Sequence, residues 1–262
     1  MATVTQKVTV NQGAAHTYFG TTLTPISFEK WLGNISLRLE QQQRGWLTGH
    51  HNLHSLYLRQ TNPDVAAFYE QCDECYLDGI PLRFILAGMG ISTSAQQRFS
   101  LMDRFEDLLS HAQSQQWSIY YLGSHATVVT RARVLLQKNY PNLRIELHAG
   151  YDLDSDSVCS AINDFAPDLL LVGLGMPGQE QWLSAHRASL DAGVAMQAGA
   201  TLDYFAGAQA RPPKWLSQLG LAWLYRLVHD PSRLWQRYLV EPWSLLLPTL
   251  QLWRNYRRGP RP

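Results

Sequence analysis

One stretch, PDLLLVGLGMPGQ at residues 167–179, most constrains what this chain can fold into. An apolar run is followed by a glycine turn and then by an amphipathic segment, EQWLSAHRASL, at residues 180–190. This order predicts a buried strand, a loop and a helix. The loop N–H groups and the positive end of the helix then point into one crevice, which favours an anionic ligand.

The same stretch leaves two other interpretations open. Residues 173–178 satisfy G-x-G-x-x-G, the dinucleotide fingerprint, so a NAD(P)-dependent oxidoreductase remains a distant alternative. The next expected strand, Val194 to Gln197, ends in Ala198 and Gly199 without the acidic residue that would bind a ribose hydroxyl. A tight turn that binds no ligand is the other alternative.

Strands and helices alternate regularly through the middle of the chain. Trp117–Leu122 and Leu143–Leu147 read as strands, and the segments 127–139 and 157–165 read as helices. We therefore expect an α/β fold with a Rossmann-like, doubly wound parallel sheet that binds ligands beyond the carboxyl ends of its strands. The expected parts are a loose N-terminal arm (1–25), a catalytic core (26–210) and a C-terminal helical appendage (211–262), which begins at Arg211-Pro212-Pro213.

The expected appendage is basic and rich in tryptophan. It carries nine Lys or Arg residues against Asp230 and Glu241, and five of the nine tryptophans of the chain, although the whole chain has a net charge of only +1. Cations and amphipathic rings suit a membrane interface, and ordinary packing onto the core is the alternative. Nucleic acid could use similar chemistry, but we expect no nucleic-acid partner.

No segment reaches the ~20 apolar residues of a spanning helix, and the polar start is unlike a signal peptide. We therefore expect a cytoplasmic protein, peripheral on the inner face of the plasma membrane. Oligomeric state stays open, and a homo-oligomer is compatible with the sequence.

Two short motifs resemble metal sites. Cys72-x-x-Cys75 has zinc-knuckle or redox spacing, but Cys159 is the one further cysteine and a zinc site needs a second ligand pair. Asp152-x-Asp154-x-Asp156 mimics a metal-binding D-x-D, but it precedes a helix and fits capping better. We expect no metal and no cofactor.

Polar residues and glycines follow several expected strands, so that parallel topology would gather them at one edge of the sheet. They are His50 and Asn52, Asp78, Gly123-Ser124, the segment from Gly173 and Gly175 to Gln179, and the segment from Gly199 to Asp203.

Seven blocks in order, from about Phe19 to Tyr238, carry a family resemblance. They are LDGIP (77–81), RFSLMD (98–103), YYLGS (120–124), YPNL (140–143), PDLLLVGLGMPGQEQW (167–182), GATLDYFAGAQARPPKW (199–215) and GLAWLYRLVHDPSRLWQRYL (220–239). The sequence resembles the WecG/TagA/CpsF family of inverting glycosyltransferases, which pass a sugar from a UDP-sugar to a polyprenyl-diphosphate-linked acceptor. The blocks RFSLMD and HHNLHSLY are similar to the xanthan-type exopolysaccharide branch, which implies β-1,4 transfer of glucose from UDP-glucose. Transfer of N-acetylmannosamine or its uronic acid is the alternative within the family.

The resemblance also implies roles for individual residues. Inverting transfer needs a base for the acceptor hydroxyl, and a partly desolvated carboxylate at Asp78 fits that role. Functional arginines of the family map onto Arg98, for substrate, and onto Arg226 and Arg233, for the diphosphate, with Arg237 able to assist.

Other residues complete the expected site. Substrate contacts fall on Asn52, Gln179 and His50, although the family usually has a threonine in place of this histidine. The expected nucleotide-binding residues are Gly123, Ser124, Gly173, Gly175, Gly199 and Asp203. Three further positions depart from the family pattern: Leu101 for glycine, Gly178 for lysine and Ala222 for glutamate. Loss of that lysine removes a cation near the phosphate crevice, so the donor sugar could differ from that of the amino-sugar members.

Overall fold

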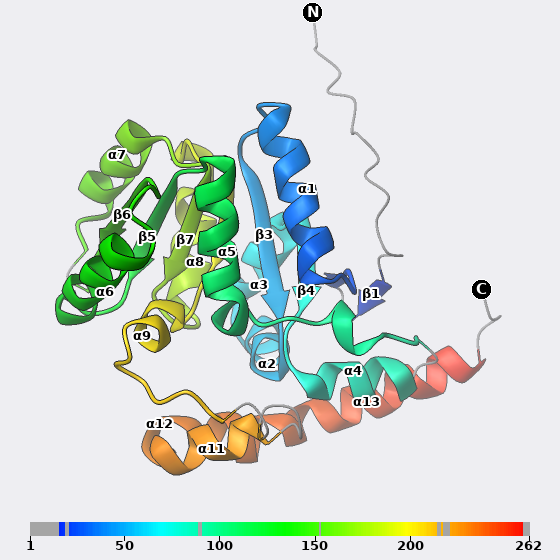
Figure 1. Cartoon of the computed structure of the whole chain (residues 1–262). Helices are drawn as coiled ribbons and strands as arrows, with labels where there is room; N and C mark the ends of the chain where they lie inside the picture. Colours follow the sequence, from blue (N-terminus) through cyan, green and yellow to red (C-terminus); the bar gives the residue numbers. More distant parts are fainter. Residues whose placement is uncertain are drawn as a thin grey trace, which may run out of the picture.

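The apolar runs of the chain form one six-stranded, all-parallel sheet. The computed structural model describes residues 16–18, 21–88, 91–151, 153–213, 216 and 221–258. The order of the strands across the sheet is β4-β3-β8-β7-β5-β6 (Figure 1). The strands are β3 (Trp46–His51), β4 (Glu74–Leu77), β5 (Ile119–Gly123), β6 (Ile145–His148), β7 (Leu169–Gly173) and β8 (Val194–Gln197). The predicted parallel α/β sheet is thereby confirmed.

Helices cover both faces of this sheet. One face carries α1 (Phe28–Glu40), α5 (Leu101–Gln115), α6 (Ala126–Asn139) and the short α9 (Thr201–Phe205). The other carries α3 (Pro63–Gln71), α7 (Ser155–Phe165) and α8 (Gly178–His186). Every residue of β5 and of β7 is buried as a result, which explains why both strands read as uninterrupted apolar runs. The connecting segments contain two short 3₁₀ turns, η1 (Ala95–Gln97) and η2 (Arg187–Ser189).

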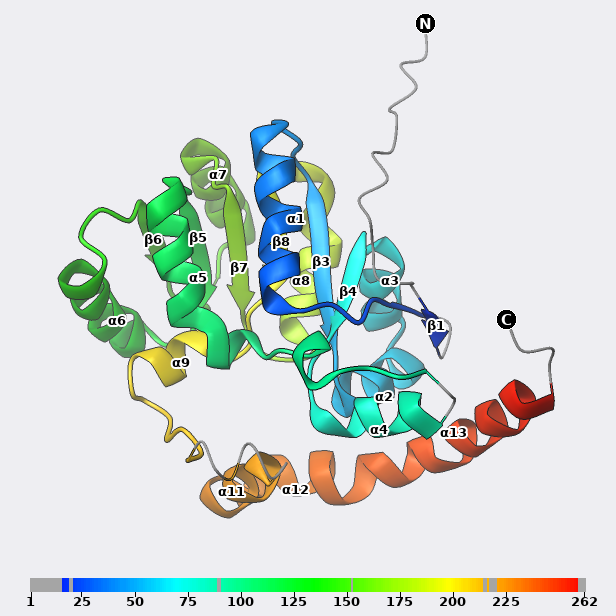
Figure 2. The same cartoon turned by 45° about the vertical axis from the view of Figure 1, so that its right-hand side comes forward.

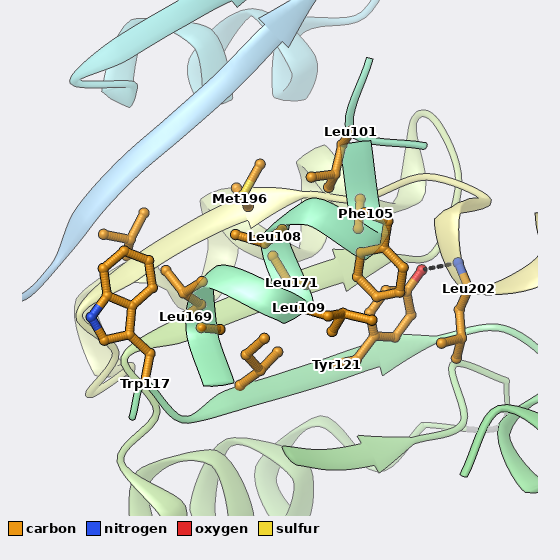
Figure 3. Packing of buried hydrophobic residues seen from close by; sticks show 14 of the residues in the cluster. Leu101, Phe105, Leu108, Leu109, Trp117, Tyr121, Leu169, Leu171, Met196 and Leu202 are labelled. Atoms are coloured by element: carbon orange, nitrogen blue, oxygen red, sulfur yellow. Dashed lines mark hydrogen bonds between the residues drawn. The ribbon is translucent and has the colours of Figure 1, made fainter. Parts of the chain in front are cut away.

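The main core lies between α5 and the centre of the sheet (Figure 3). Phe105 and Leu109 are fully buried there, beside Tyr121 and Leu171. The phenol of Tyr121 accepts a hydrogen bond from the N–H of Leu202 (3.3 Å) and donates one to the carbonyl of Gly199 (3.1 Å). These two bonds attach the loop after β8 to the middle of the sheet.

Part of the expected N-terminal arm is ordered against the core. Within the described residues, β1 (His16–Tyr18) and β2 (Thr21–Leu23) pair antiparallel, and residues 1–15 lie outside the description. The N–H of Thr24 donates to the carbonyl of Cys75 (2.8 Å), and Leu23 is fully buried. The end of this segment therefore packs on the edge strand β4.

The carboxyl edge of the sheet is covered by α2 (Leu53–Thr61), α4 (Ile80–Gly88) and the C-terminal helices (Figure 2). Those helices are α11 (Ala222–His229), α12 (Pro231–Trp235), the π-helical turn η3 (Gln236–Val240) and α13 (Glu241–Arg258). From α12 the chain runs through η3 into α13 without a break. Pro242 lies within this continuous helical run and does not end it.

Two contacts join α13 to the core. Leu245 is buried in an apolar cluster with Leu56 of α2 and Leu82 of α4. Nδ1 of His54 in α2 contacts Oε2 of Glu241 in α13, and both side chains are largely buried. In the part of the chain that the structure describes, no helix is both long enough and apolar enough to cross a membrane.

Candidate active site

Two adjoining cavities lie at the carboxyl edge of the sheet, between the core and the C-terminal helices. The larger cavity has a volume of about 380 Å³ and the smaller about 260 Å³. Seven residues line both: Asn52, His54, Asp78, Ser100, Arg226, Arg237 and Tyr238. The larger cavity adds the Gly175 loop, Gln179, Gly199 and His50, and the smaller adds Arg98, Asp103 and Trp223. Asp78 and Arg226 thus stand where the two cavities meet.

Asp78 directly follows β4. Its N–H donates to the carbonyl of His51 (2.9 Å), which continues the pairing of β4 with β3. Gly79 then takes a left-handed φ of +94°, which turns the chain sharply into α4. This local geometry keeps Asp78 at the edge of the sheet, where its side chain lines both cavities.

Asp103 is a second carboxylate of the smaller cavity. It lies in the first turn of α5, and burial together with the neighbouring Asp78 carboxylate raises its pKa above the ordinary value. Arg226 and Arg98 partly offset this rise. The smaller cavity therefore gathers two acidic and at least two basic side chains.

Arg226 of α11 places a largely buried guanidinium in both cavities. Burial acts to lower its pKa, but Tyr204, Tyr238 and Asp78 outweigh that effect and the pKa is raised. The guanidinium carbon lies 5.5 Å from the ring centre of Tyr204, and the buried Nε has no hydrogen-bond partner. A cation with an unsatisfied donor in a cavity is suited to an anionic ligand.

The other predicted arginines fall into two groups. Arg237 of η3 lines both cavities, and Arg98 lines the smaller one. Arg233 belongs to α12, but its side chain lies outside what the structure describes.

Asn52 and His50 come from β3 and the turn after it. Asn52 caps α2: its Oδ1 accepts from the N–H of Ser55 (3.0 Å), and Ser55 Oγ accepts from the N–H of Asn52 (2.9 Å). Burial lowers the pKa of His50 and favours the neutral ring, and its buried Nδ1 has no hydrogen-bond partner. Both residues line the larger cavity.

Gln179 is almost fully buried, and its amide is engaged inside the protein. Its Oε1 accepts from the N–H of Gly199 (3.0 Å), and its Nε2 donates to Oε1 of Glu180 (2.9 Å). The Gly175 loop and the Gly199 loop are thereby tied together on one wall of the larger cavity.

Four predicted nucleotide-binding residues, Gly123, Ser124, Gly173 and Asp203, are not among the described residues that line either cavity. Ser124 Oγ donates to Oδ2 of Asp203 (2.8 Å). A Cβ at Gly173 would collide with the Tyr121 phenol and the carbonyl of Gly199. In this structure these residues therefore contact one another and neighbouring parts of the protein beside the two cavities.

Several cavity or supporting residues were absent from the sequence prediction: Tyr69, Asp103, Glu180, Gln197 and Tyr238. Glu180 lies on the buried side of α8 with Trp182 and Leu183. Its spacing from these apolar residues was the sequence signal that could have predicted its burial. Among the described residues, no group of three or more His, Cys, Asp or Glu side chains could hold a metal ion. Asp152 of the D-x-D motif lies outside the described residues. Cys72, Cys75 and Cys159 are free thiols that form no disulfide bond with one another.

Comparison with known proteins relates the chain to a family of glycosyltransferases. The model of the family described as "Glycosyl transferase WecG/TagA/CpsF family" matches residues 16–259. Similar proteins include the N-acetylglucosaminyldiphosphoundecaprenol N-acetyl-beta-D-mannosaminyltransferases of Staphylococcus aureus strains MW2 and NCTC 8325. Each is 30% identical over 190 residues, which cover 69% of this chain and 74% of the relative.

Proposed function

The chain belongs to the WecG/TagA/CpsF family of glycosyltransferases, and we propose that it moves a sugar from a UDP-sugar to an acceptor linked to a polyprenyl diphosphate. It is therefore an enzyme, and the family replaces the oxidoreductase alternative. One observation supports the proposal most directly. A single carboxylate, Asp78, stands with Arg226 and Arg237 at the junction of two cavities, which suits a reaction between two bound substrates.

In the proposed reaction the larger cavity holds the UDP-sugar and the smaller cavity holds the acceptor sugar. Asp78 accepts the proton of the acceptor hydroxyl, and that oxygen attacks the anomeric carbon from the face opposite UDP. The bond between the anomeric carbon and the phosphate oxygen breaks, and UDP leaves with the electron pair. The configuration at the anomeric carbon is inverted.

The departing diphosphate gains negative charge, and fixed cations must meet it. We assign this task to Arg226 and Arg237, with Arg233 as a further candidate from the sequence. The unpartnered Nε of Arg226 and the N-terminus of α8 behind the Gly175 loop support binding of phosphate at this wall. The proposal uses these groups in place of a metal ion.

The relatives favour UDP-N-acetylmannosamine as donor and an N-acetylglucosaminyl-diphosphoundecaprenol type of acceptor, because these are the sugars that their names specify. Residues of this chain favour a second donor, UDP-glucose. Gly178 replaces a cation next to the Gly175 loop, and the RFSLMD block is similar to the glucosyltransferase branch. The resemblance of the RFSLMD and HHNLHSLY blocks to the xanthan-type branch favours a role in exopolysaccharide assembly.

We also propose that the C-terminal helices bind the inner membrane surface, where the lipid-linked acceptor lies. Large apolar side chains are exposed along them: Trp223, Leu224, Val228, Trp235, Leu239, Val240, Trp243, Leu246, Leu247 and Leu250. Exposed Arg254 adds positive charge on α13. Apolar and cationic groups on one element suit an interfacial helix that rests on anionic lipid.

A transfer assay tests the reaction and the donor together. Purified full-length protein is incubated with radiolabelled UDP-N-acetylmannosamine or UDP-glucose and with N-acetylglucosaminyl-diphosphoundecaprenol or glucosyl-diphosphoundecaprenol. Label in the lipid fraction from one donor supports the proposal and identifies the sugar. No transfer from any donor and acceptor pair, together with no thermal stabilisation by UDP, would refute it, because a ligand at a hundred times its Kd adds about 2.7 kcal/mol of stability.

A further inference from the structure

Glu180 is a fully buried carboxylic acid that the proposed reaction does not use. It lies in the first turn of α8, immediately behind the wall of the larger cavity. Its Oε1 accepts hydrogen bonds from the side-chain amides of both Gln179 (2.9 Å) and Gln197. Its Oε2 is buried without a hydrogen-bond partner. One oxygen of Glu180 therefore accepts hydrogen bonds from two glutamine side chains.

The side chain of each of these glutamines accepts a hydrogen bond from the backbone N–H of a residue that lines the larger cavity. Oε1 of Gln179 accepts from Gly199 (3.0 Å), and Oε1 of Gln197 accepts from His50 (2.8 Å). The two N–H groups belong to different parts of the sheet edge, the loop after β8 and the strand β3. Glu180 thus connects two separate sections of the cavity wall.

The acid also selects the orientation of both amides. A glutamine amide can point either its oxygen or its nitrogen at a neighbour. Because Oε1 of Glu180 accepts, the two Nε2 groups must point toward it, and the two amide oxygens are then directed at backbone donors. Tyr69 reinforces the second arm: its hydroxyl donates to the carbonyl of His50 (3.0 Å) and accepts from Nε2 of Gln197 (3.0 Å).

We propose that Glu180 is a positioning residue for the donor nucleotide, which fixes the loops at His50 and Gly199 through the amides of Gln197 and Gln179. The inference rests on the proposed function, in which the larger cavity takes the UDP-sugar. Burial raises the pKa of Glu180 to about 7, so the neutral form of the acid, which burial favours, predominates below that pH. A carboxyl group that served only the folding of α8 would not need to orient two cavity-lining segments.

Three variants separate positioning from simple stabilisation. Glu180→Leu removes the acceptor of both amides, Glu180→Gln retains an amide oxygen that accepts in its place, and Gln197→Met cuts only the arm to His50. Glu40→Gln, on the exposed last residue of α1, is the matched control. For each full-length protein the Kd for UDP is measured by calorimetry, and the amide exchange of His50 and Gly199 is measured by NMR.

We expect Glu180→Leu to weaken UDP binding about tenfold or more and to speed exchange at both amides, and Gln197→Met to act at His50 alone. Glu180→Gln should restore binding to near the wild-type value. Should Glu180→Leu not fold, Gln197→Met and Glu180→Gln carry the same comparison. Unchanged exchange at both amides, or wild-type affinity for UDP in Gln197→Met and Glu180→Leu, overturns the inference. A folded wild-type protein that does not bind UDP counts instead against the proposed function, and the exchange measurement then still decides whether the network exists.

Discussion

Nδ1 of His54 lies 2.5 Å from Oε2 of Glu241, which joins helix α2 of the core to the first turn of α13. Both side chains are about six-sevenths buried, and both line the larger cavity. Glu241 follows directly on η3, the segment that carries Arg237. The contact therefore fixes the position of the cationic helices relative to Asp78.

Loss of this contact should reduce the stability of the protein. We expect Glu241→Ala to lower the free energy of unfolding by about 1–3 kcal/mol, because it leaves a largely buried imidazole without its partner. The double variant with His54→Ala should cost less than the sum of the two single changes, since the residues interact. Urea unfolding of the four proteins measures both quantities.

The control for this cycle is Glu70→Ala, at an exposed residue whose contact with Arg59 is 3.8 Å long. It should change the free energy of unfolding by less than about 1 kcal/mol. Additive effects of His54→Ala and Glu241→Ala would mean that the contact contributes nothing to holding the helices.

Replacement of the proposed base tests the chemistry at Asp78. Asp78→Asn keeps the shape of the side chain but cannot accept a proton at neutral pH, so we expect kcat for transfer to fall by about 10²–10⁴-fold. UDP affinity should be retained, because the diphosphate is assigned to the arginines. Transfer kinetics and UDP calorimetry measure the two effects, and Asp107→Asn on the exposed side of α5 is the control. Retention of wild-type kcat would remove Asp78 from the base role.

The sequence was sufficient to predict the parallel sheet, because its central strands are buried on both faces and read as continuous apolar runs. Glycine turns after β7 and β8 also marked the edge at which Asp78, Gly175 and Gly199 line a common cavity. The pairing of β1 with β2 was not predicted. Its strands have three residues each, and the segment is held by the contact of Thr24 with Cys75, far away in the sequence.

The remainder of the site depends on which side of each helix faces the sheet. Glu180 and Asp103 are charged residues in amphipathic helices, where a solvent-exposed position is the ordinary expectation. Ser124 and Asp203, predicted to bind the nucleotide, hydrogen-bond to each other and are not among the described residues that line either cavity. Neither outcome follows from spacing along the chain, because both depend on how separate elements meet in space.

Membrane binding by the C-terminal helices predicts a loss of affinity when their exposed apolar groups are made polar. Trp243 is 71% exposed and Leu247 is 69% exposed, so their replacement by serine should cost the fold little. Burial of such side chains in lipid is worth about 1.5–3 kcal/mol each, so the double variant should bind at least about tenfold more weakly. Flotation with vesicles of phosphatidylglycerol and phosphatidylcholine measures the partition.

Val134→Ser is the matched control for that experiment, because Val134 is 62% exposed on α6, at the opposite end of the sheet. It should leave flotation unchanged. Equal flotation of the wild type and the Trp243→Ser, Leu247→Ser double variant would show that these helices do not make the lipid contact.

The buried acid behind the cavity predicts a specific dependence of stability on pH. Burial raises the pKa of Glu180 from 4.5 to about 7, and hydrogen bonds from Gln179 and Gln197 and the charge of Arg237 act in the opposite direction. Between these two values the folded protein retains a proton that the unfolded chain releases. The stability contributed by the neutral acid is therefore fully present below about pH 4.5 and is lost as the pH rises through 7.

Glu180→Gln removes this titration while keeping the size of the side chain. Its free energy of unfolding relative to wild type should rise by roughly 2 kcal/mol between pH 5 and pH 8, because one pKa unit corresponds to about 1.4 kcal/mol. Other titrating groups are common to both proteins and cancel in the difference. Urea unfolding at the two pH values measures it, with Glu40→Gln as a control whose difference from wild type should stay constant. A difference between Glu180→Gln and wild type that does not change with pH would mean that Glu180 ionises in the folded protein as it does in the unfolded chain.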